Sequence, residues 1–175
     1  MSSFAELVKN RRSIRYFTEE KLKPEEVEQI MKAALMAPTA KNNRSWHFVL
    51  VENEAVLKQL SLCKSSGSSP IEKCALAVIV LNNPSESVAP IEDSAIAATY
   101  IQLQAEDLGL GSCWIQIAGR NTADGLDSEQ YIHELMGIPL AYGIGCIIAI
   151  GHKAKDSSPH DEETLQWEKV HPDIF

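Results

Sequence analysis

Hydrophobic and polar residues follow two periods along this chain, one typical of helices and one of buried strands. After Pro24, apolar side chains recur every three or four positions, which predicts an amphipathic helix that ends before Pro38. Continuous apolar runs bounded by turn residues predict strands. These runs are residues 47–51, 74–81, 113–117 and 143–151.

Capping signals predict three further helices, and composition predicts a fourth. Ser3 and Glu6 form a capping box, which predicts a short helix that runs into Lys9. Asn53 and Asp127 are helix N-caps by the same logic, the first for a helix to about residue 62 and the second for one ending at Gly137. Residues 93–108 are rich in alanine and apolar on most sides, so we expect a central helix with several packing neighbours.

The predicted order is two helices, then strand and helix in alternation, ending in a strand and an acidic tail. This order indicates a three-layer α/β/α arrangement in one domain, residues 1–175. Residues 64–70 lack apolar periodicity and predict a mobile surface loop. The tail, residues 153–175, is too apolar at its end to be disordered, so we expect it to dock on another surface, a partner subunit being one candidate.

Composition narrows the function classes. The net charge of −8 argues against a nucleic-acid partner. The first residues lack a secretion signal and no apolar run approaches the length of a membrane span, so we expect a soluble, cytoplasmic protein. The four cysteines form no C-x-x-C pair, which predicts buried free thiols, and the histidines are too scattered for a metal site.

Common catalytic motifs are absent from the sequence. It contains no G-x-S-x-G elbow, no P-loop and no H-E-x-x-H helix, which argues against the hydrolases, NTPases and zinc enzymes that such motifs mark. No G-x-G-x-x-G follows a predicted strand, which disfavours a Rossmann dinucleotide site. Cofactor chemistry is therefore a leading possibility.

A basic cluster in this acidic chain is the first candidate site. Arg11, Arg12, Ser13 and Arg15 lie within five positions, and guanidinium groups beside a hydroxyl donor suit a phosphomonoester. The alternative is a solvated basic turn after the first helix. A second candidate is residues 37–47, which gather amide, hydroxyl and cationic groups before a strand and could either grip a polar planar ligand or form a simple turn.

Four motifs in order resemble the FMN-dependent nitroreductase family over nearly the whole chain. They are Arg-Arg-Ser-x-Arg-x-Phe from residue 11, Ala-Pro-Thr-Ala-x-Asn-x-x-x-Trp-His-Phe from residue 37, Gly-Leu-Gly-x-Cys-Trp-Ile from residue 109, and Gly-Ile-Pro at 137 followed by Ile-Gly-His-Lys at 150. The resemblance implies an α+β, three-layer α/β/α fold with a central mixed sheet flanked by helices. It also implies a homodimer with FMN at the subunit interface.

The resemblance also implies the roles of individual residues. Arg11, Ser13 and Arg15, with Arg12 beside them, would bind the FMN phosphate and ribityl chain, and Gly151 and Lys153 would contact the cofactor at the other end of the chain and close that site. Asn42 would bind the polar edge of the isoalloxazine, and Trp114, Ile115 and Gln116 would pass one face or edge of it. The second subunit would supply Pro38, Thr39 and Ala40. From the residues alone, Trp114 could equally be a core aromatic and Lys153 a surface lysine.

The sequence departs from the family pattern at two places. Arg44 and Ser45 stand where the family often has glutamine and proline, and only Lys155 and Lys169 follow Lys153 where the family commonly has a further arginine. The implied reaction is ping-pong hydride transfer from NAD(P)H through flavin N5 to nitroaromatic, quinone or related conjugated acceptors. Two alternatives stay open: a flavin-binding carrier or sensor without turnover, and an unrelated interaction domain without flavin.

Overall fold

The computed structural model describes residues 3–175. Within them, the predicted order of helices and strands is confirmed, and most boundaries differ from the predicted ones by one to three residues. The elements in chain order are α1 (Phe4–Asn10), α2 (Pro24–Leu35), β1 (Trp46–Val51), α3 (Glu54–Leu60), β2 (Leu76–Asn82), α4 (Pro90–Asp107), β3 (Gly111–Gln116), α5 (Ser128–Met136) and β4 (Gly143–Gly151). Short 3-10 turns lie between and after them at Ala40–Asn42 (η1), Ser69–Lys73 (η2), Glu162–Thr164 (η3) and Trp167–Lys169 (η4).

The four strands form one sheet in the order β1-β2-β4-β3. Each neighbouring pair is antiparallel, so the expectation of a mixed sheet is corrected for these strands. Among residues 3–175, the one parallel pairing is the isolated bridge between Ser13 and Ser112. Strand direction could not be read from the apolar runs, because a buried run has the same composition in either direction.

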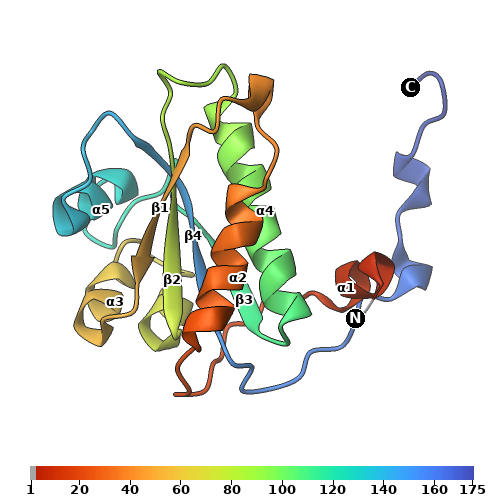
Figure 1. The fold of residues 1–175 in the computed structure, drawn as a ribbon, viewed down its shortest axis with the longest axis horizontal. Coiled ribbons are helices and arrows are strands. Elements are labelled where there is room, and N and C mark those ends of the chain that lie inside the picture. Colours follow the sequence, from red (N-terminus) through yellow and green to blue (C-terminus); the bar gives the residue numbers. More distant parts are fainter. Residues whose placement is uncertain (1–2) are drawn as a thin grey trace.

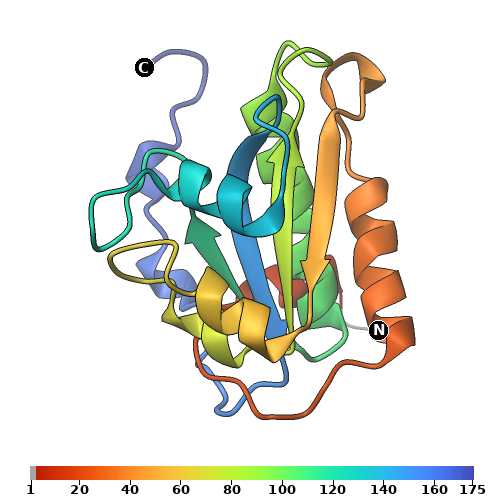
Figure 2. The same cartoon turned by 90° about the vertical axis from the view of Figure 1, so that its left-hand side faces the viewer.

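Helices cover both faces of the sheet, as the three-layer prediction requires. Figures 1 and 2 show α2 and α4 on one face and the smaller α3 and α5 on the other. Every residue of β2 is buried, and its side chains alternate between the two core clusters: Ile79 belongs to the α3/α5 side and Val78 to the α2/α4 side. Ala98 and Ala105 of α4 are fully buried there and permit close contact with the sheet.

The predicted caps are present. Ser3 and Glu6 form the capping box of α1, and the Asn53 and Asp127 side chains accept from the first amides of α3 and α5. Gly137 ends α5 in the left-handed conformation, with φ of 65°. The segment 64–70 differs from the expected surface loop at its end, because Ser68 and Pro70 are buried and Ser69–Lys73 forms η2.

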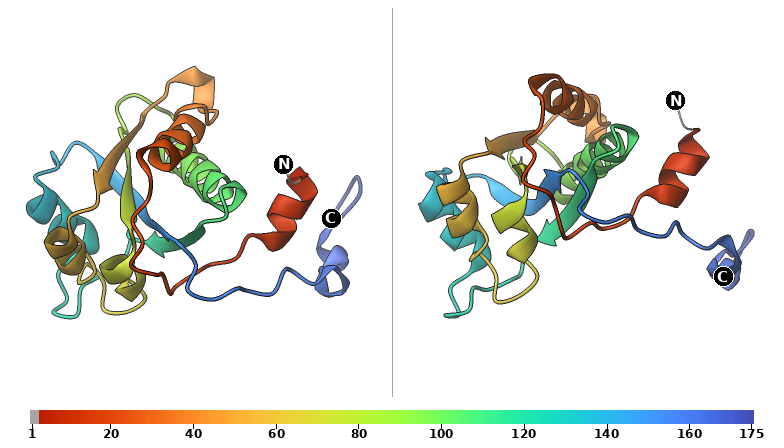
Figure 3. Two further views of the ribbon diagram at one scale, coloured as in Figure 1. Left: turned by 60° about the horizontal axis from the view of Figure 1, so that its bottom comes forward. Right: turned by 90° about the horizontal axis from the view of Figure 1, so that it is seen from below.

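Helix α1, which contacts α4, and the tail project from the fold. Both extend to one side of the sheet and helices in Figures 1 and 3. They contact each other through an ion pair between Lys9 and Glu162, at 2.6 Å, and a hydrogen bond from the His160 amide to the Lys9 carbonyl. Helix α1 contains no buried residue. The tail therefore docks on α1 of its own chain, and both leave apolar side chains exposed.

Candidate functional site

Two glycines permit the arginine segment, residues 11–17, to pack against the end of the sheet. Gly111 and Gly151 are cross-strand partners at the ends of β3 and β4. A Cβ at Gly111 would lie 2.7 Å from Ile14 Cγ2, and one at Gly151 would lie 3.0 Å from Phe17 Cδ1. Because any larger residue would push Ile14 or Phe17 away, these glycines permit residues 13–17 to lie directly against the sheet. Gly151, predicted to contact cofactor, is buried and has this packing role.

A backbone hydrogen bond holds the arginine segment against β3, and its polar side chains face outward. The Ile14 amide donates to the Ser112 carbonyl at 2.9 Å, and the Ile14 side chain is buried. Its neighbours Ser13 and Arg15 are exposed. This alternation buries the apolar residue and leaves the hydroxyl and the guanidinium on the outer side.

The arginines differ in what they contact. Arg12 donates to the carbonyls of Ser158 and Pro159, at 2.8 and 3.3 Å, so it ties the tail to this segment. Arg15 makes one long contact, 3.4 Å, with the Ser13 carbonyl. Arg11 makes no side-chain hydrogen bond or ion pair with another residue in the range 3–175. Arg11 and Arg15 therefore keep most of their guanidinium donors free for an anion, whereas Arg12 uses one of its nitrogens on the tail.

Lys153 lies beside the same segment. It forms an antiparallel bridge with Phe17, and its ammonium contacts the Glu106 carboxylate of α4 at 2.7 Å. Both side chains are largely buried, 18% exposed for Lys153 and 10% for Glu106. Lys153 is thus not a simple surface lysine: its backbone pairs with Phe17, two residues after Arg15, and a largely buried ion pair fixes its ammonium. Lys155 is exposed, and Lys169 lies on the projecting tail.

The free edge of β3 continues from this basic site. The Ser112 carbonyl points away from β4, because it accepts from Ile14. Backbone groups two and four residues further along a strand point the same way, so Trp114 and Gln116 also present theirs to the free edge. Ile115 has the opposite orientation, and its side chain is 1% exposed in the core. Its neighbours, rather than Ile115, are placed to meet a ligand.

An apolar cavity of about 330 Å³ opens where β3 ends. Trp114 and Gln116 contribute from β3, and Ile91 and Ser94 from the first turns of α4. The Trp114 indole donates to the Gln116 side-chain oxygen at 3.1 Å, which fixes both side chains at the cavity wall. Trp114 packs against the core and lines the cavity, so both of its predicted roles are compatible with its position.

The loop that carries Pro38, Thr39, Ala40 and Asn42 lies at the same end of the sheet but does not line this cavity. Its backbone is unusual, since Lys41, Asn42 and Arg44 all have positive φ, between 52° and 58°. The Arg44 guanidinium donates to Asn42 Oδ1 at 3.2 Å, which leaves the Asn42 amino group available. The departure from the family pattern at Arg44 therefore supports the shape of the loop.

A buried carboxylate anchors this loop. Asp93 of α4 is 2% exposed and accepts from the Ala40 amide at 2.7 Å and the Ser87 hydroxyl at 2.6 Å. Ser45, which stands where the family often has proline, adds a longer contact to the same carboxylate at 3.4 Å. A hydroxyl at position 45 thus has a partner that proline could not use.

Comparison with known proteins decides the family. A family model described as the Nitroreductase family matches residues 8–76 and 70–152. The chain belongs to the nitroreductase family.

Several nitroreductase relatives share most of its length. An FMN-dependent nitroreductase structure from Clostridium difficile R20291 superposes with a TM-score of 0.95, at 37% identity over 98% of this chain and 100% of that one. A protein of Archaeoglobus fulgidus, provisionally named an NADH dehydrogenase/NAD(P)H nitroreductase, is 27% identical over 98% of both chains. The FMN reductase (NADPH) of Bacillus subtilis is 29% identical over 88% of this chain and 67% of its own. The predicted nitroreductase fold is confirmed.

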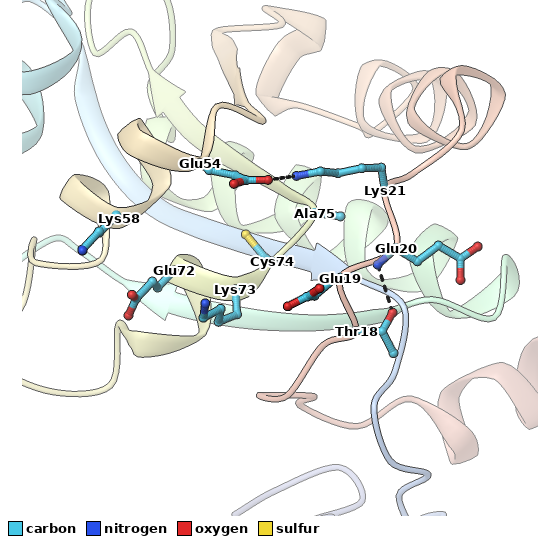
Figure 4. A pocket seen from close by; sticks show the side chains of 10 residues that line it. All are labelled: Thr18, Glu19, Glu20, Lys21, Glu54, Lys58, Glu72, Lys73, Cys74 and Ala75. Carbon is cyan, nitrogen blue, oxygen red and sulfur yellow. Dashed lines mark hydrogen bonds and ion pairs between the residues drawn. The ribbon is translucent and has the colours of Figure 1, made fainter.

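A second cavity of this nitroreductase chain contains none of the predicted site residues. It measures about 460 Å³ and lies beside the segment that follows the arginines (Figure 4). Lys21 and Glu54 form an ion pair at 2.7 Å along one side of it, and both side chains are more than half exposed. Cys74 faces it from a buried position, where burial raises the pKa of the thiol to about 12. A thiol with so high a pKa is a poor nucleophile at neutral pH.

The prediction of buried free thiols is confirmed. All four cysteines are buried and unpaired. Residues 3–175 contain no cluster of three or more histidine, cysteine or acidic side chains able to hold a metal ion. Within the same range, no helix combines the length and the apolar character needed to cross a membrane.

The structure thus brings together two of the predicted groups and separates the third. Arg11, Ser13, Arg15 and Lys153 share one end of β3, and Trp114 and Gln116 share the cavity at the other end. The third group, the loop from Pro38 to Asn42, lies outside that cavity. Sequence reasoning missed Asp93, Glu106 and Gly111. No distinct sequence signal marked Asp93, because an acid is common in the first turn of a helix and Glu92 stands beside it.

Proposed function

We propose that this protein is an FMN-dependent oxidoreductase that transfers hydride from NAD(P)H to nitroaromatic, quinone or related conjugated acceptors in a ping-pong order. One observation carries the proposal: the free edge of β3 joins a cationic site to an apolar cavity. From Ser112 to Gln116 the strand advances about 13 Å, at about 3.3 Å per residue. Such a site suits an elongated ligand with an anionic end and a flat, mostly apolar end.

FMN fits the residues at both ends. Arg11, Ser13, Arg15 and Lys153 would hold its phosphate through charge-assisted hydrogen bonds. Trp114 and Gln116 would contact the ring system, and backbone groups at the free edge of β3 would donate to and accept from its polar atoms. When bound, FMN supplies the hydride chemistry, so the protein needs no acid–base pair of its own for that step. The chain's part is to orient the ring and to exclude water from the cavity.

We further propose that the protein acts as a homodimer that shares each FMN site between two chains. Two features support this. The Pro38 to Asn42 loop contributes nothing to the cavity of its own chain. In addition, α1 and the tail expose large apolar side chains, including Phe4 at 70% and Trp167 at 71%, and exposed apolar surface of this kind is typical of interaction sites. Helix α1 and the tail project from the fold, where a partner chain would have access to both (Figure 3).

The proposal is tested with the purified protein. We expect a yellow preparation that binds one FMN per chain, loses its flavin absorbance with NADH or NADPH, and regains it with a quinone or nitroaromatic. Parallel lines in double-reciprocal plots would support the ping-pong order. Bound flavin that NAD(P)H does not reduce would favour a carrier or sensor instead. A colourless protein that takes up no added FMN would overturn the proposal.

A further inference from the structure

Glu106 occupies a position that is unfavourable for a carboxylate. It lies in the last turn of α4, followed by Asp107, where the helix carries no basic residue. The C-terminal end of a helix bears partial negative charge, which disfavours acids there. Glu106 is also only 10% exposed, so little solvent screens it. The Lys153 ammonium at 2.7 Å is the partner that compensates for this position.

Lys153 is fixed by its backbone as well as by this ion pair. Its backbone bridges Phe17, and the amide of the next residue, Ala154, donates to the Tyr16 carbonyl at 3.1 Å. An ammonium has three donors, and the structure gives Lys153 one hydrogen bond, to Glu106. Two donors therefore remain for an anion at the arginine segment.

The same geometry makes Glu106 oppose that anion. An oxygen that accepts from the Lys153 ammonium would lie at most about 5.5 Å from the Glu106 oxygen, because two charge-assisted bonds of about 2.7 Å would share one nitrogen. At that separation two negative charges repel each other appreciably, even with the dielectric typical of a protein surface. Lys153 would attract the anion while Glu106 repels it.

We propose that Glu106 is a positioning residue that sets the phosphate affinity of this site. It holds the Lys153 ammonium beside the arginines, and its charge lowers the affinity for a phosphate dianion below what the cations alone would give. The inference rests on the proposed function. Because the effect acts on the phosphate, it should change the binding of FMN and leave that of riboflavin, which lacks the phosphate, unchanged.

The Glu106→Gln variant separates the two roles. Its amide oxygen still accepts from Lys153, but the negative charge is gone. We expect the FMN Kd of the full-length apoprotein, measured by quenching of flavin fluorescence, to fall roughly tenfold. The riboflavin Kd should not change. Asp107→Asn is the matched control: it removes an exposed charge from the same turn, and we expect it to change the FMN Kd less than about twofold.

Lys153→Gln tests the other partner. It should raise the FMN Kd and leave the riboflavin Kd unchanged. If either Glu106→Gln or Lys153→Gln leaves the ratio of FMN to riboflavin affinity at the wild-type value, the inference is overturned. Wild-type protein that binds neither flavin would instead refute the proposed function, so the two failures are distinguishable.

A folding defect in Glu106→Gln would not end the test. Thermal melting of each apoprotein reports it, and the comparison then moves to Lys153→Gln and the Glu106→Gln/Lys153→Gln double variant, which has no ion pair to lose. The double variant should bind FMN more tightly than Lys153→Gln, because the repelling carboxylate is absent. Equal affinities would contradict the proposal.

Discussion

Replacing Asp93 by alanine should destabilise the protein through the loop that it anchors. The carboxylate is 2% exposed and accepts two short hydrogen bonds, from the Ala40 amide and the Ser87 hydroxyl, and one long one from Ser45. Hydrogen bonds to a charged group contribute about 1.5–3 kcal/mol each. Counting only the two short bonds, we expect the free energy of unfolding to fall by about 3–6 kcal/mol.

Urea denaturation followed by circular dichroism measures this change. Glu92→Gln is the matched control, because Glu92 is the exposed neighbour of Asp93, and its effect should stay within about 0.5 kcal/mol. Ser45→Ala removes only the 3.4 Å contact and should cost about 1 kcal/mol or less. A loss below about 1 kcal/mol in Asp93→Ala would refute the argument that this carboxylate holds the loop.

Three further predictions concern the arginines, the buried cysteines and the tail. Replacing both Arg11 and Arg15 by alanine should weaken FMN binding by orders of magnitude, because each lost phosphate contact costs about 1.5–3 kcal/mol. The helix content, measured by circular dichroism, should not change. Unchanged FMN affinity in the folded variant would contradict the phosphate assignment. Burial raises the pKa of Cys63 from 9.0 to about 11 and that of Cys74 to about 12, so the native state favours the protonated thiols. The contribution of these thiols to stability is complete below about pH 9 and is lost as the pH rises toward 11–12. The melting temperature should fall over that window, and it should fall less steeply in Cys74→Ala. Equal slopes of melting temperature against pH in the two proteins would argue against this linkage. Replacing Leu165, Trp167 and Val170 by serine should shift the protein from dimer to monomer in sedimentation velocity, whereas a stable dimer would show that the tail does not hold the subunits together.

The elements of the fold were predictable because each has a local signal. The helix caps, the apolar period of α2 and the continuous run of β2 depend only on neighbours in sequence. The pairing of the strands was not predictable, because β4 inserts between β2 and β3 and no local pattern specifies that contact. The end of the 64–70 segment shows the same limit: its polar composition indicated a surface loop, yet Pro70 is buried.

The site was predictable as a set of residues but not as a network. The arginine cluster was visible as a basic run in an acidic chain. Its partners were not, because Glu106 and Lys153 are 47 positions apart and Gly111 matters only through the space that Ile14 needs. The altered residues Arg44 and Ser45 left the shape of their loop open at the sequence level. The structure explains both through Asn42 and Asp93.

Subunit complementation tests the central proposal, a shared FMN site, most directly. One variant carries Arg11→Ala and Arg15→Ala, and the other carries Asn42→Asp, which places a carboxylate where the loop would meet the ring. Each homodimer should bind FMN weakly. If the arginines and the loop of one site come from different chains, the mixed dimer has one intact site and one site with both defects. After the two variants are unfolded together and refolded, we predict one FMN of wild-type affinity per mixed dimer. A mixed dimer with no tight site would contradict the account.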